Sequence, residues 1–206
     1  MSGTRGAQDV VEAPSTLFER LAWHHGALST WALSPTDGAT PIPPPLLASL
    51  RAGRDATAAS SALQQVVFAS LDLRLHASPP VSVRELRSAA AACVAQHTPW
   101  RADPEGAGAG MRGFSHLVGY GSTYYSYAYG RAISGSVWRA LRMDDEPTAA
   151  AAGAALWGGL LRSGGADEPR ASVAAVAGPS ALVTLAPGAP GWAPEPGAAL
   201  RDLLRE

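Results

Sequence analysis

The residues best suited to chemistry in this 206-residue chain lie in one stretch, HLVGYGSTYYSYAYGR, residues 116–131. It holds every tyrosine of the chain: Tyr120, Tyr124, Tyr125, Tyr127 and Tyr129. If a helix is extended backward from Tyr127, then Tyr124 and Tyr120 share its face, because residues three and four apart are neighbours on a helix. Tyr125 and Tyr129 point to the other side, and we expect them to pack in the core.

Two glycines, Gly119 and Gly121, interrupt this projected helix. We therefore expect Tyr120 and His116 on a mobile loop just before it. A tyrosine hydroxyl is a neutral hydrogen-bond donor over a wide pH range, so a tyrosine face beside such a loop is suited to stabilising a developing oxyanion. An aromatic core whose hydroxyls reach polar partners explains the same pattern, and spacing alone favours that interpretation.

A second candidate site lies in QDVVEAPSTLFE, residues 8–19. Asp9 and Glu12 are one helical turn apart and Glu19 is two turns beyond Glu12, so all three can share a face. One of these carboxylates could bind a metal ion, and another could hold a neighbouring ligand by hydrogen bonding. Taken alone, however, a face of carboxylates is usually solvated.

Composition limits the partners. The net charge of −1 argues for neither nucleic acid nor an anionic membrane, and no apolar run is long enough to span a bilayer. The single cysteine, Cys93, lies in an alanine-rich run, which predicts a buried thiol. The first residues, MSGTRGAQDVVE, have neither the apolar core of a signal peptide nor an arginine-rich presequence pattern, so we expect no targeting signal in this chain.

Apolar periodicity predicts helices over residues 9–23, 56–76, 81–97, 123–141 and 149–161, and a short one over 198–204. Ser82 and Glu85 form a predicted capping box, and Pro14 is expected to kink the first helix or mark its first turn. Residues 34–45 and 102–113 read as loops. Residues 178–206 read as a loose tail with one weak strand candidate, 181–185. The predicted fold is all-α, with residues 1–206 as part of one catalytic domain.

Two motifs resemble a known family. VEAPSTLFE, residues 11–19, and FSHLVGYGSTYYSYAYGRAIS, residues 114–134, are similar to the C-terminal part of the thimet oligopeptidase family of zinc metallopeptidases. ASSALQQVVFASLDLRLH, residues 59–76, resembles the long helix of that family. The similarity runs from residue 2 to about residue 176. It implies the C-terminal helical part of a zincin-like oligopeptidase catalytic domain, and FSHLVGYG followed by YYSY is most similar to the mitochondrial members.

The resemblance implies roles at matching positions. Glu12 matches the third protein ligand of the catalytic zinc. Tyr124 matches the residue that stabilises the oxyanion, and Tyr127 lies beside it in the family motif. His116 matches a loop histidine that contacts the substrate or the tetrahedral intermediate, and Tyr120 matches another residue of that loop.

Gly119 and Gly121 fit the need of that loop to close over a peptide. Asp9 and Glu19, as groups that hold a neighbouring zinc ligand in place, are inferred from spacing and not from the resemblance. The cofactor implied is one zinc ion per complete active site, of which this chain offers the ligand Glu12.

The sequence departs from the family at the zinc site. Family members carry HExxH on a helix, which supplies two histidine ligands and the glutamate that activates water. HExxH does not occur here. In the family it lies shortly upstream of the segment matched by SGTR, residues 2–5. We therefore expect a C-terminal piece of the enzyme, through a shortened reading frame, alternative initiation or a split enzyme, with the missing N-terminal part as its partner.

Other histidines are poor replacements for the missing ligands. His24 and His25 are adjacent and would point in different directions from a helix. Asp72 and His76 are four residues apart, a spacing that could hold a metal ion, but a histidine near a helix C-terminus is better explained by the helix dipole. His97 is explained in the same way. Since a zinc site needs three or four protein ligands, we do not expect an independent one.

Three functions stay open. The chain is a zinc metalloendopeptidase or a fragment of one, which by resemblance trims short N-terminal peptides from imported precursor proteins in the mitochondrial matrix. Alternatively, it is a non-catalytic peptide-binding module that keeps the closing loop. A third possibility is an inactive truncated product. The missing HExxH favours the last two for this polypeptide, whereas Glu12, His116, Tyr124 and Tyr127 favour the first.

Overall fold

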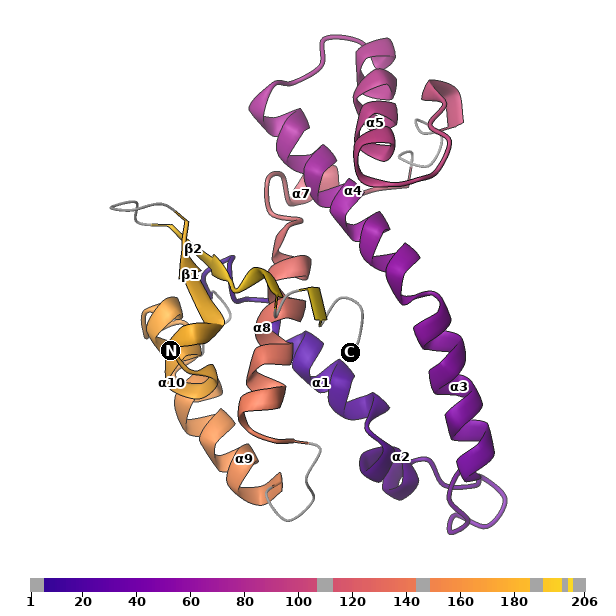
Figure 1. Cartoon of the computed structure of the whole chain (residues 1–206), viewed down its shortest axis with the longest axis vertical. Coiled ribbons are helices and arrows are strands. Elements are labelled where there is room, and N and C mark those ends of the chain that lie inside the picture. Colours follow the sequence, from indigo (N-terminus) through magenta and orange to yellow (C-terminus); the bar gives the residue numbers. More distant parts are fainter. Residues whose placement is uncertain (1–5, 107–112, 144–148, 186–190, 198–199, 202–206) are drawn as a thin grey trace. The chain divides into compact units, whose positions relative to one another are not determined.

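A computed structural model describes residues 6–106, 113–143, 149–185, 191–197 and 200–201. The chain forms two compact units: the first unit comprises residues 1–58 and 129–206, and the second unit comprises residues 59–128. Helices dominate both, and the only sheet among the described residues has two short strands (Figure 1). This confirms the all-α fold class. Among the described helices, none combines the length and the apolar character needed to cross a bilayer.

The first unit is built from the two ends of the chain. Its helices are α1 (Ala13–Trp23), α2 (His25–Trp31), α3 (Pro44–Ala56), α8 (Ser126–Ala140, from Tyr129), α9 (Ala149–Leu156) and α10 (Pro169–Ala177). The α9 helix continues as a π-helical turn, η2 (Trp157–Leu161), and α10 is followed by the short 3₁₀ helix η3 (Pro179–Ala181). The predicted helices over 123–141 and 149–161 therefore exist, with ends that differ by a few residues.

The α1 helix begins later than its apolar pattern predicts. Residues 8–12 form turns, and Pro14 occupies the first helical turn, where its missing N–H costs no hydrogen bond. Of the two roles predicted for Pro14, the structure shows the helix start and not a kink. Glu12 is the N-cap residue of α1.

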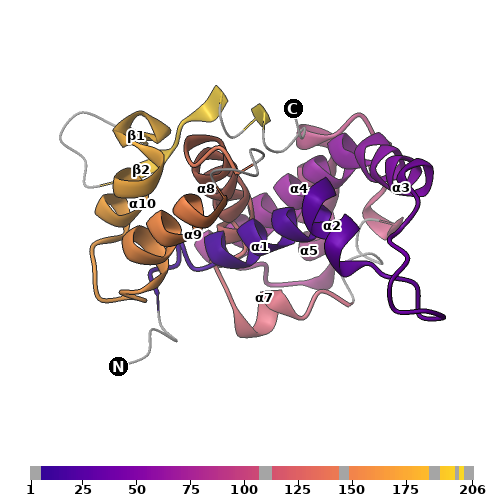
Figure 2. The same cartoon turned by 90° about the horizontal axis from the view of Figure 1, so that it is seen from below.

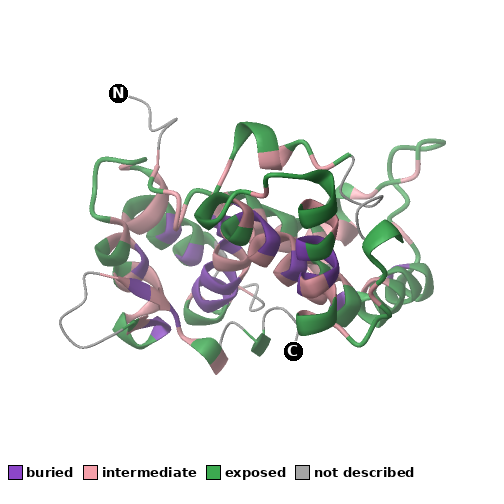
Figure 3. Cartoon of the chain, turned by 90° about the horizontal axis from the view of Figure 1, so that it is seen from above, coloured by how far each residue is buried: buried purple, intermediate pink, exposed green. Residues whose placement is uncertain are grey.

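A single apolar cluster holds the first unit together. It joins α1, α8, α9, α10 and the small sheet, and its buried members include Leu17, Ile133, Val137, Leu156, Val173, Leu182 and Trp192. In Figures 1 and 2, α10 lies next to the two strands. Figure 3 shows the buried residues on the inward faces of these helices. The N-terminal and C-terminal segments thus share one core.

The segment predicted to be a loose tail contains ordered structure. The strands β1 (Leu182–Thr184) and β2 (Trp192–Pro194) pair antiparallel, with Leu182 opposite Pro194. Leu182 and Trp192 are buried in the core cluster, so apolar burial orders this part of the tail despite its prolines and glycines. The weak strand candidate at 181–185 was therefore correct. The predicted helix at 198–204 falls largely outside the described residues.

The second unit is centred on two antiparallel helices, α4 (Ala58–Ala77) and α5 (Val83–His97), visible in the upper part of Figure 1. Their buried contact residues are Val67, Leu71, Ala89, Ala90 and Cys93. Small alanines on α5 allow the two helices to approach closely. The buried thiol of Cys93 confirms the sequence prediction, and burial raises its pKa.

The predicted capping box of α5 is present. Ser82 Oγ accepts a hydrogen bond from the Glu85 N–H, and Glu85 Oε2 accepts one from the Val81 N–H. These bonds satisfy donors at the helix start that have no partner within the helix. A one-turn helix, α7 (His116–Gly119), and the first residues of α8 complete the unit.

The helices of the described residues that were not predicted include α2, α3 and α10. The α3 helix begins at the end of the proline-rich stretch that reads as a loop, because prolines suit the first turn of a helix as well as a loop. The short α2 follows α1 after a single break at His24. The α10 helix starts after Glu168, whose carboxylate accepts the N–H groups of Arg170 and Ala171. Periodicity over nine alanine-rich residues is too weak to reveal it.

Candidate active site

The second unit brings four of the predicted site residues together. His116, Tyr120, Tyr124 and Tyr127, which we call the tyrosine cluster, lie with their rings in contact. The ring centroids of His116 and Tyr124 are 5.4 Å apart, and those of Tyr124 and Tyr127 are 5.0 Å apart. The His116 Nε2 lies 3.3 Å from the Tyr127 hydroxyl. Tyr120, at the edge of the cluster, has its ring centroid 5.8 Å from that of His116.

The tyrosine cluster packs on two phenylalanine rings. Phe114 stacks on Phe68 of α4 with centroids 4.5 Å apart, and the Tyr124 ring meets both edge-on at 4.8 and 5.7 Å. Such edge-to-face pairs add stability beyond the area they bury. The aromatic-core interpretation therefore holds for the ring of Tyr124, since this residue is only 9% exposed.

The Tyr124 hydroxyl is held in its protonated form. It donates a hydrogen bond to Gln65 Oε1, 3.1 Å away. Burial raises the pKa of Tyr124 above its ordinary value of 10.0, the Gln65 hydrogen bond lowers it in part, and the nearby Tyr127 raises it further. A hydroxyl in this environment is a neutral donor at every physiological pH.

A buried carboxylate shapes the backbone that carries Tyr124. Asp72 of α4 is 1% exposed. Its Oδ1 accepts the Ser122 N–H at 3.0 Å and its Oδ2 accepts the Tyr124 N–H at 2.9 Å. Ser122 has a φ of 63°, in the left-handed region that a non-glycine residue adopts at a cost of about 1 kcal/mol. The two charge-assisted bonds from Asp72 stabilise this turn.

His76 links the same carboxylate to the glycine loop. Its Nδ1 lies 3.0 Å from Asp72 Oδ1 and 2.8 Å from the Asp72 carbonyl oxygen, one turn earlier in α4. The imidazole ring occupies the place where a Cβ on Gly121 would stand. Gly121 is thus required by close packing, whereas nothing lies within 4 Å of an added Cβ at Gly119. The sequence prediction assigned both glycines to loop closure, a role that stays a prediction.

The helix predicted from residue 123, which would place Tyr124 and Tyr127 on one face, starts too early in the sequence, whereas the prediction that Tyr120 lies before that helix is confirmed. The α8 helix begins at Ser126, so Tyr124 precedes it, and Tyr120 is the C-cap residue of α7. Ser122 has a φ of 63°, which an α-helix does not contain, so no helix can run from Tyr120 through to Tyr127. The turn, rather than a helix surface, places Tyr124 beside Tyr127.

Tyr129, which was predicted to pack in the core, is half-buried. In the first unit its ring lies 6.5 Å from that of the buried Trp192. Burial raises the pKa of Tyr129, and the negative charge of Asp9 raises it further. Tyr125 is half-buried.

Glu12 lies in the first unit, where its backbone is tightly packed. A Cβ added to the buried Gly130 of α8 would lie 2.8 Å from the Glu12 carbonyl carbon. Thr16 joins the same two segments, since its hydroxyl lies 2.8 Å from the Glu12 carbonyl oxygen and 2.9 Å from that of Gly130. The Ser15 hydroxyl donates to Glu12 Oε2 at 2.9 Å. Backbone packing therefore sets the position of Glu12, while its carboxylate is only half-buried.

The other two predicted carboxylates have different surroundings. Asp9 lies in a turn before α1, so it does not share a helix face with Glu12 and Glu19. Glu19 Oε1 lies 3.3 Å from the Arg54 guanidinium and 4.0 Å from that of Arg131. Glu19 is therefore an ion-pair partner of arginines in the first unit. A supporting role for either residue at a zinc site stays a prediction.

The described residues do not fit a whole zinc site. No group of three or more His, Cys, Asp or Glu side chains within the described ranges is arranged to hold a metal ion. The Asp72 and His76 pair is engaged with the turn at Ser122 and Tyr124 instead. Glu12 has the chemistry of one zinc ligand, but within the described residues it belongs to no group of three or more such side chains.

Comparison with known proteins decides the family. The model of the family described as "Peptidase family M3" matches residues 1–182, which include the whole second unit and most of the first. The chain belongs to peptidase family M3. Three similar relatives of this M3 chain are named mitochondrial intermediate peptidases. One from Arabidopsis thaliana is 35% identical over 86% of the chain and 24% of its own length.

The two fungal relatives give the same result. The protein from Candida glabrata is 34% identical over 85% of the chain and 23% of its own length. The protein from Phaeosphaeria nodorum is 34% identical over 68% of the chain and 17% of its own length. The M3 chain thus spans about a quarter of these relatives or less. The resemblance drawn from VEAPSTLFE and FSHLVGYGSTYYSYAYGRAIS is confirmed as a family assignment.

Sequence reasoning missed four residues that position the site. Gln65 and Asp72 hold the hydroxyl and the backbone of Tyr124, and Thr16 and Gly130 hold the backbone of Glu12. A signal existed for Asp72, because a carboxylate one residue after Leu71 on the apolar face of a helix needs buried partners. Nothing in the sequence pairs Gly130 with Glu12, since 118 positions separate them.

Proposed function

We propose that this chain supplies the C-terminal part of the active site of a zinc metalloendopeptidase. The observation that carries the proposal is the tyrosine cluster, in which Tyr124 lies beside His116 and Tyr127 with its hydroxyl kept protonated by burial. Membership of peptidase family M3 supports hydrolysis of peptide bonds as the reaction.

Tyr124 is proposed to donate a hydrogen bond to the carbonyl oxygen of the scissile peptide. That oxygen gains negative charge as the carbonyl carbon is attacked, and a fixed neutral donor stabilises the charge more than it stabilises the starting amide. In the structure the hydroxyl donates to Gln65 Oε1, so the peptide oxygen would replace Gln65 as the acceptor of this hydrogen bond.

His116 and the loop after it are proposed to contact the peptide. Tyr127 lies within hydrogen-bond distance of the His116 ring, which orients the imidazole. Tyr120 is 66% exposed, so it can meet a ligand without leaving a core position. Gly119 and Gly121 are proposed to let this loop close over the bound peptide.

Glu12 is proposed as one protein ligand of a single zinc ion, with Asp9 and Glu19 holding neighbouring groups in place. When bound, zinc polarises a peptide carbonyl and lowers the pKa of a coordinated water. The family's remaining ligands belong to HExxH, which this sequence lacks. We propose that a polypeptide segment outside this sequence, from the N-terminal part of the catalytic domain, supplies them and is a necessary partner.

The names of the relatives support a mitochondrial peptidase. All three are called mitochondrial intermediate peptidases. We propose that the complete enzyme acts in the mitochondrial matrix and removes short N-terminal peptides from imported precursor proteins. Neither nucleic acid nor a membrane is part of this proposal.

Reconstitution tests the proposed function. The purified chain, alone and mixed with a separately produced polypeptide carrying a family HExxH helix, is assayed for bound zinc and for cleavage of a quenched peptide. We expect neither from the chain alone and both from the mixture. Tyr124→Phe should lower kcat of the mixture about 100-fold, the usual loss for one oxyanion donor. Tyr125→Phe removes a hydroxyl outside the cluster and is the matched control.

Two results would contradict the proposal. A mixture that binds zinc but shows equal rates for the Tyr124→Phe and Tyr125→Phe variants removes the catalytic role of Tyr124. Cleavage by the chain alone that is abolished by Glu12→Ala shows that no second segment is needed.

A second candidate function is a peptide-binding module without catalysis. The observation that favours it is the lack of a complete metal-ligand group within the described residues, together with the missing HExxH motif. It predicts that the chain alone binds peptides and that no HExxH polypeptide restores cleavage. An inactive truncated product would do neither.

A further inference from the structure

The strongest unassigned feature of the first unit is a cavity of about 150 Å³ formed by α1, α3 and α8. Four arginines line it, Arg20, Arg51, Arg54 and Arg131, together with two carboxylates, Glu19 and Asp55. The lining therefore has an excess of two positive charges. Such an excess in a concave site attracts anions, because surrounding protein lowers the local dielectric and focuses the field.

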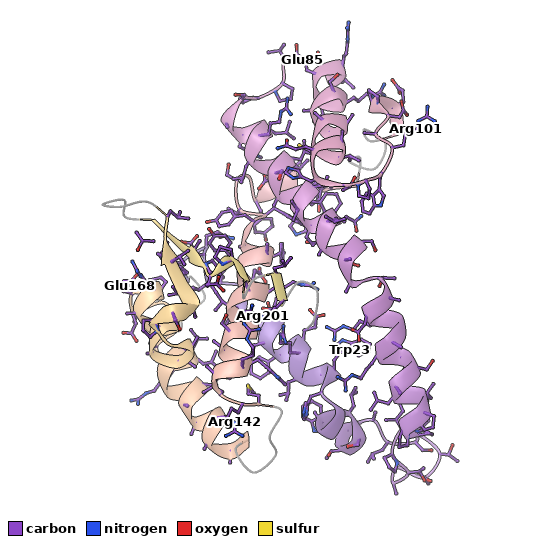
Figure 4. The ribbon with its side chains drawn as sticks, viewed as in Figure 1. Trp23, Glu85, Arg101, Arg142, Glu168 and Arg201 are labelled. Carbon is purple, nitrogen blue, oxygen red and sulfur yellow. The ribbon has the colours of Figure 1, made fainter. Side chains whose placement is uncertain are left out.

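Two of these arginines are held in place before any ligand arrives. The Arg54 guanidinium lies over the Trp23 ring, 4.6 Å from its centroid, and Figure 4 shows Trp23 in the space between α1 and α3. Glu19 lies between Arg54 and Arg131, at 3.3 and 4.0 Å. The side chains of Arg54 and Arg131 are only 21% and 26% exposed. Positioned guanidiniums lose little conformational freedom on binding a ligand.

The rest of the lining limits the size of the ligand. Trp23, Trp138 and His24 supply flat walls, and the His24 ring lies 5.8 Å from that of Trp138. A volume of about 150 Å³ admits a group the size of a carboxylate with its attached side chain, and not a whole folded partner. The planar fork of arginine matches the two oxygens of a carboxylate.

The cavity is continuous with the segment that carries Glu12. Thr16 lines the cavity and bonds the Glu12 carbonyl oxygen. Glu19 follows Glu12 by seven residues, which is about 10 Å along a helix at about 1.5 Å per residue. An extended peptide covers that distance in roughly three residues at about 3.3 Å each.

We propose that this cavity is a binding site for a carboxylate of the peptide ligand, located about three residues from the group bound near Glu12. The assignment of the ligand as a peptide rests on the proposed function, whereas the affinity for a carboxylate rests on the arginines alone. Two parts of a peptide can supply this carboxylate: an Asp or Glu side chain, or the C-terminus of a short peptide.

Binding to the 206-residue chain tests the proposal without any catalysis. Three acetylated tetra-alanine probes are used: one with a free C-terminal carboxylate, one with a C-terminal amide, and one amide with glutamate at position three. Sodium phosphate is a fourth probe. Binding is followed by the NMR signals of the Trp23 and Trp138 indole N–H groups. We expect at least one carboxylate peptide to bind at least 10-fold more tightly than the neutral amide, and the stronger one identifies the source.

Matched variants locate the effect. Arg51→Gln removes a charge from the cavity wall, and Arg84→Gln removes an exposed charge from α5 in the second unit. Arg51→Gln should weaken carboxylate binding about 10-fold, while Arg84→Gln should not change it. Arg54→Lys keeps the charge but loses the fork, and should weaken binding as well. Circular dichroism confirms that each variant is folded.

Three outcomes would overturn the proposal: equal binding of the neutral and acidic peptides, binding of phosphate with no binding of either carboxylate peptide, or equal losses for Arg51→Gln and Arg84→Gln. The result is separable from the peptidase proposal. Carboxylate binding with no cleavage by the reconstituted mixture leaves the cavity assigned and removes the enzyme. Cleavage by the mixture without any preference for carboxylate peptides supports the peptidase proposal and removes the assignment of the cavity.

Discussion

The two predicted halves of the site are positioned by different forces. Around Tyr124, one buried carboxylate, Asp72, accepts two backbone N–H groups across 50 residues of chain. Around Glu12, close contact with the backbone of Gly130 leaves no room for a Cβ. The first arrangement depends on hydrogen bonds from a charged group, and the second depends on the absence of an atom. Different substitutions should therefore disrupt the arrangement around Tyr124 and the arrangement around Glu12.

Removing the Asp72 carboxylate should have the largest effect on stability. Asp72→Ala leaves the N–H groups of Ser122 and Tyr124 without their acceptor, and an unsatisfied buried donor costs about 1–3 kcal/mol. We expect a loss of roughly 3 kcal/mol in the free energy of unfolding, measured by urea denaturation. Asp103→Ala removes an exposed carboxylate that accepts one N–H, from Gly106, and should cost less than about 1 kcal/mol. Equal losses would show that Asp72 has no special role.

Adding one methyl group should disturb the Glu12 segment next. Gly130→Ala places a Cβ 2.8 Å from backbone atoms of Glu12, which cannot swing aside as a side chain can. We expect a loss of about 1–3 kcal/mol. Gly53→Ala is the control, because this glycine lies within α3 with nothing inside 4 Å of the added Cβ, and alanine favours a helix by up to about 1 kcal/mol. Opposite signs for the two variants are the expected result of thermal denaturation.

The glycine loop offers a smaller and sharper test within the second unit. Gly121→Ala collides with the His76 ring, which can move away only by giving up its contact with Asp72. We expect a loss of about 1 kcal/mol, and almost none for Gly119→Ala. In a double-mutant cycle, Gly121→Ala should cost nothing further in the His76→Ala background. A full cost in that background would exclude His76 as the cause.

High pH should produce the smallest effect. The pKa of Tyr124 is raised in the folded state, so its neutral form is favoured there, and this contribution to stability is complete below pH 10. It is lost as the pH rises from 10 through the folded pKa. Tyr129 behaves in the same direction. Tyr124→Phe should therefore show a smaller decline in stability above pH 10 than the unmodified chain, as measured by urea denaturation at each pH.

Sequence patterns predicted local features well where one helix carries the information. The α5 capping box and the burial of Cys93 depend on residues within one or two turns of each other. The α4 helix likewise shows its periodicity over five turns. Predictions that depended on contacts between distant segments were less accurate. Tyr124 and Tyr127 were predicted to share one face of a helix from residue 123, whereas α8 begins at Ser126 and Ser122 before it has a φ of 63°.

The sequence by itself determined the helical class, the family motifs and the residue types at the candidate site, because propensity, capping and motif spacing are local properties of the chain. Only the tertiary structure decided which groups meet. Asp72 turns the backbone at Ser122, Gly130 admits the Glu12 segment, and arginines from three helices share one cavity. Each of these contacts joins residues at least 30 positions apart, for which no sequence period exists, so tertiary packing and long-range hydrogen bonds select the partners.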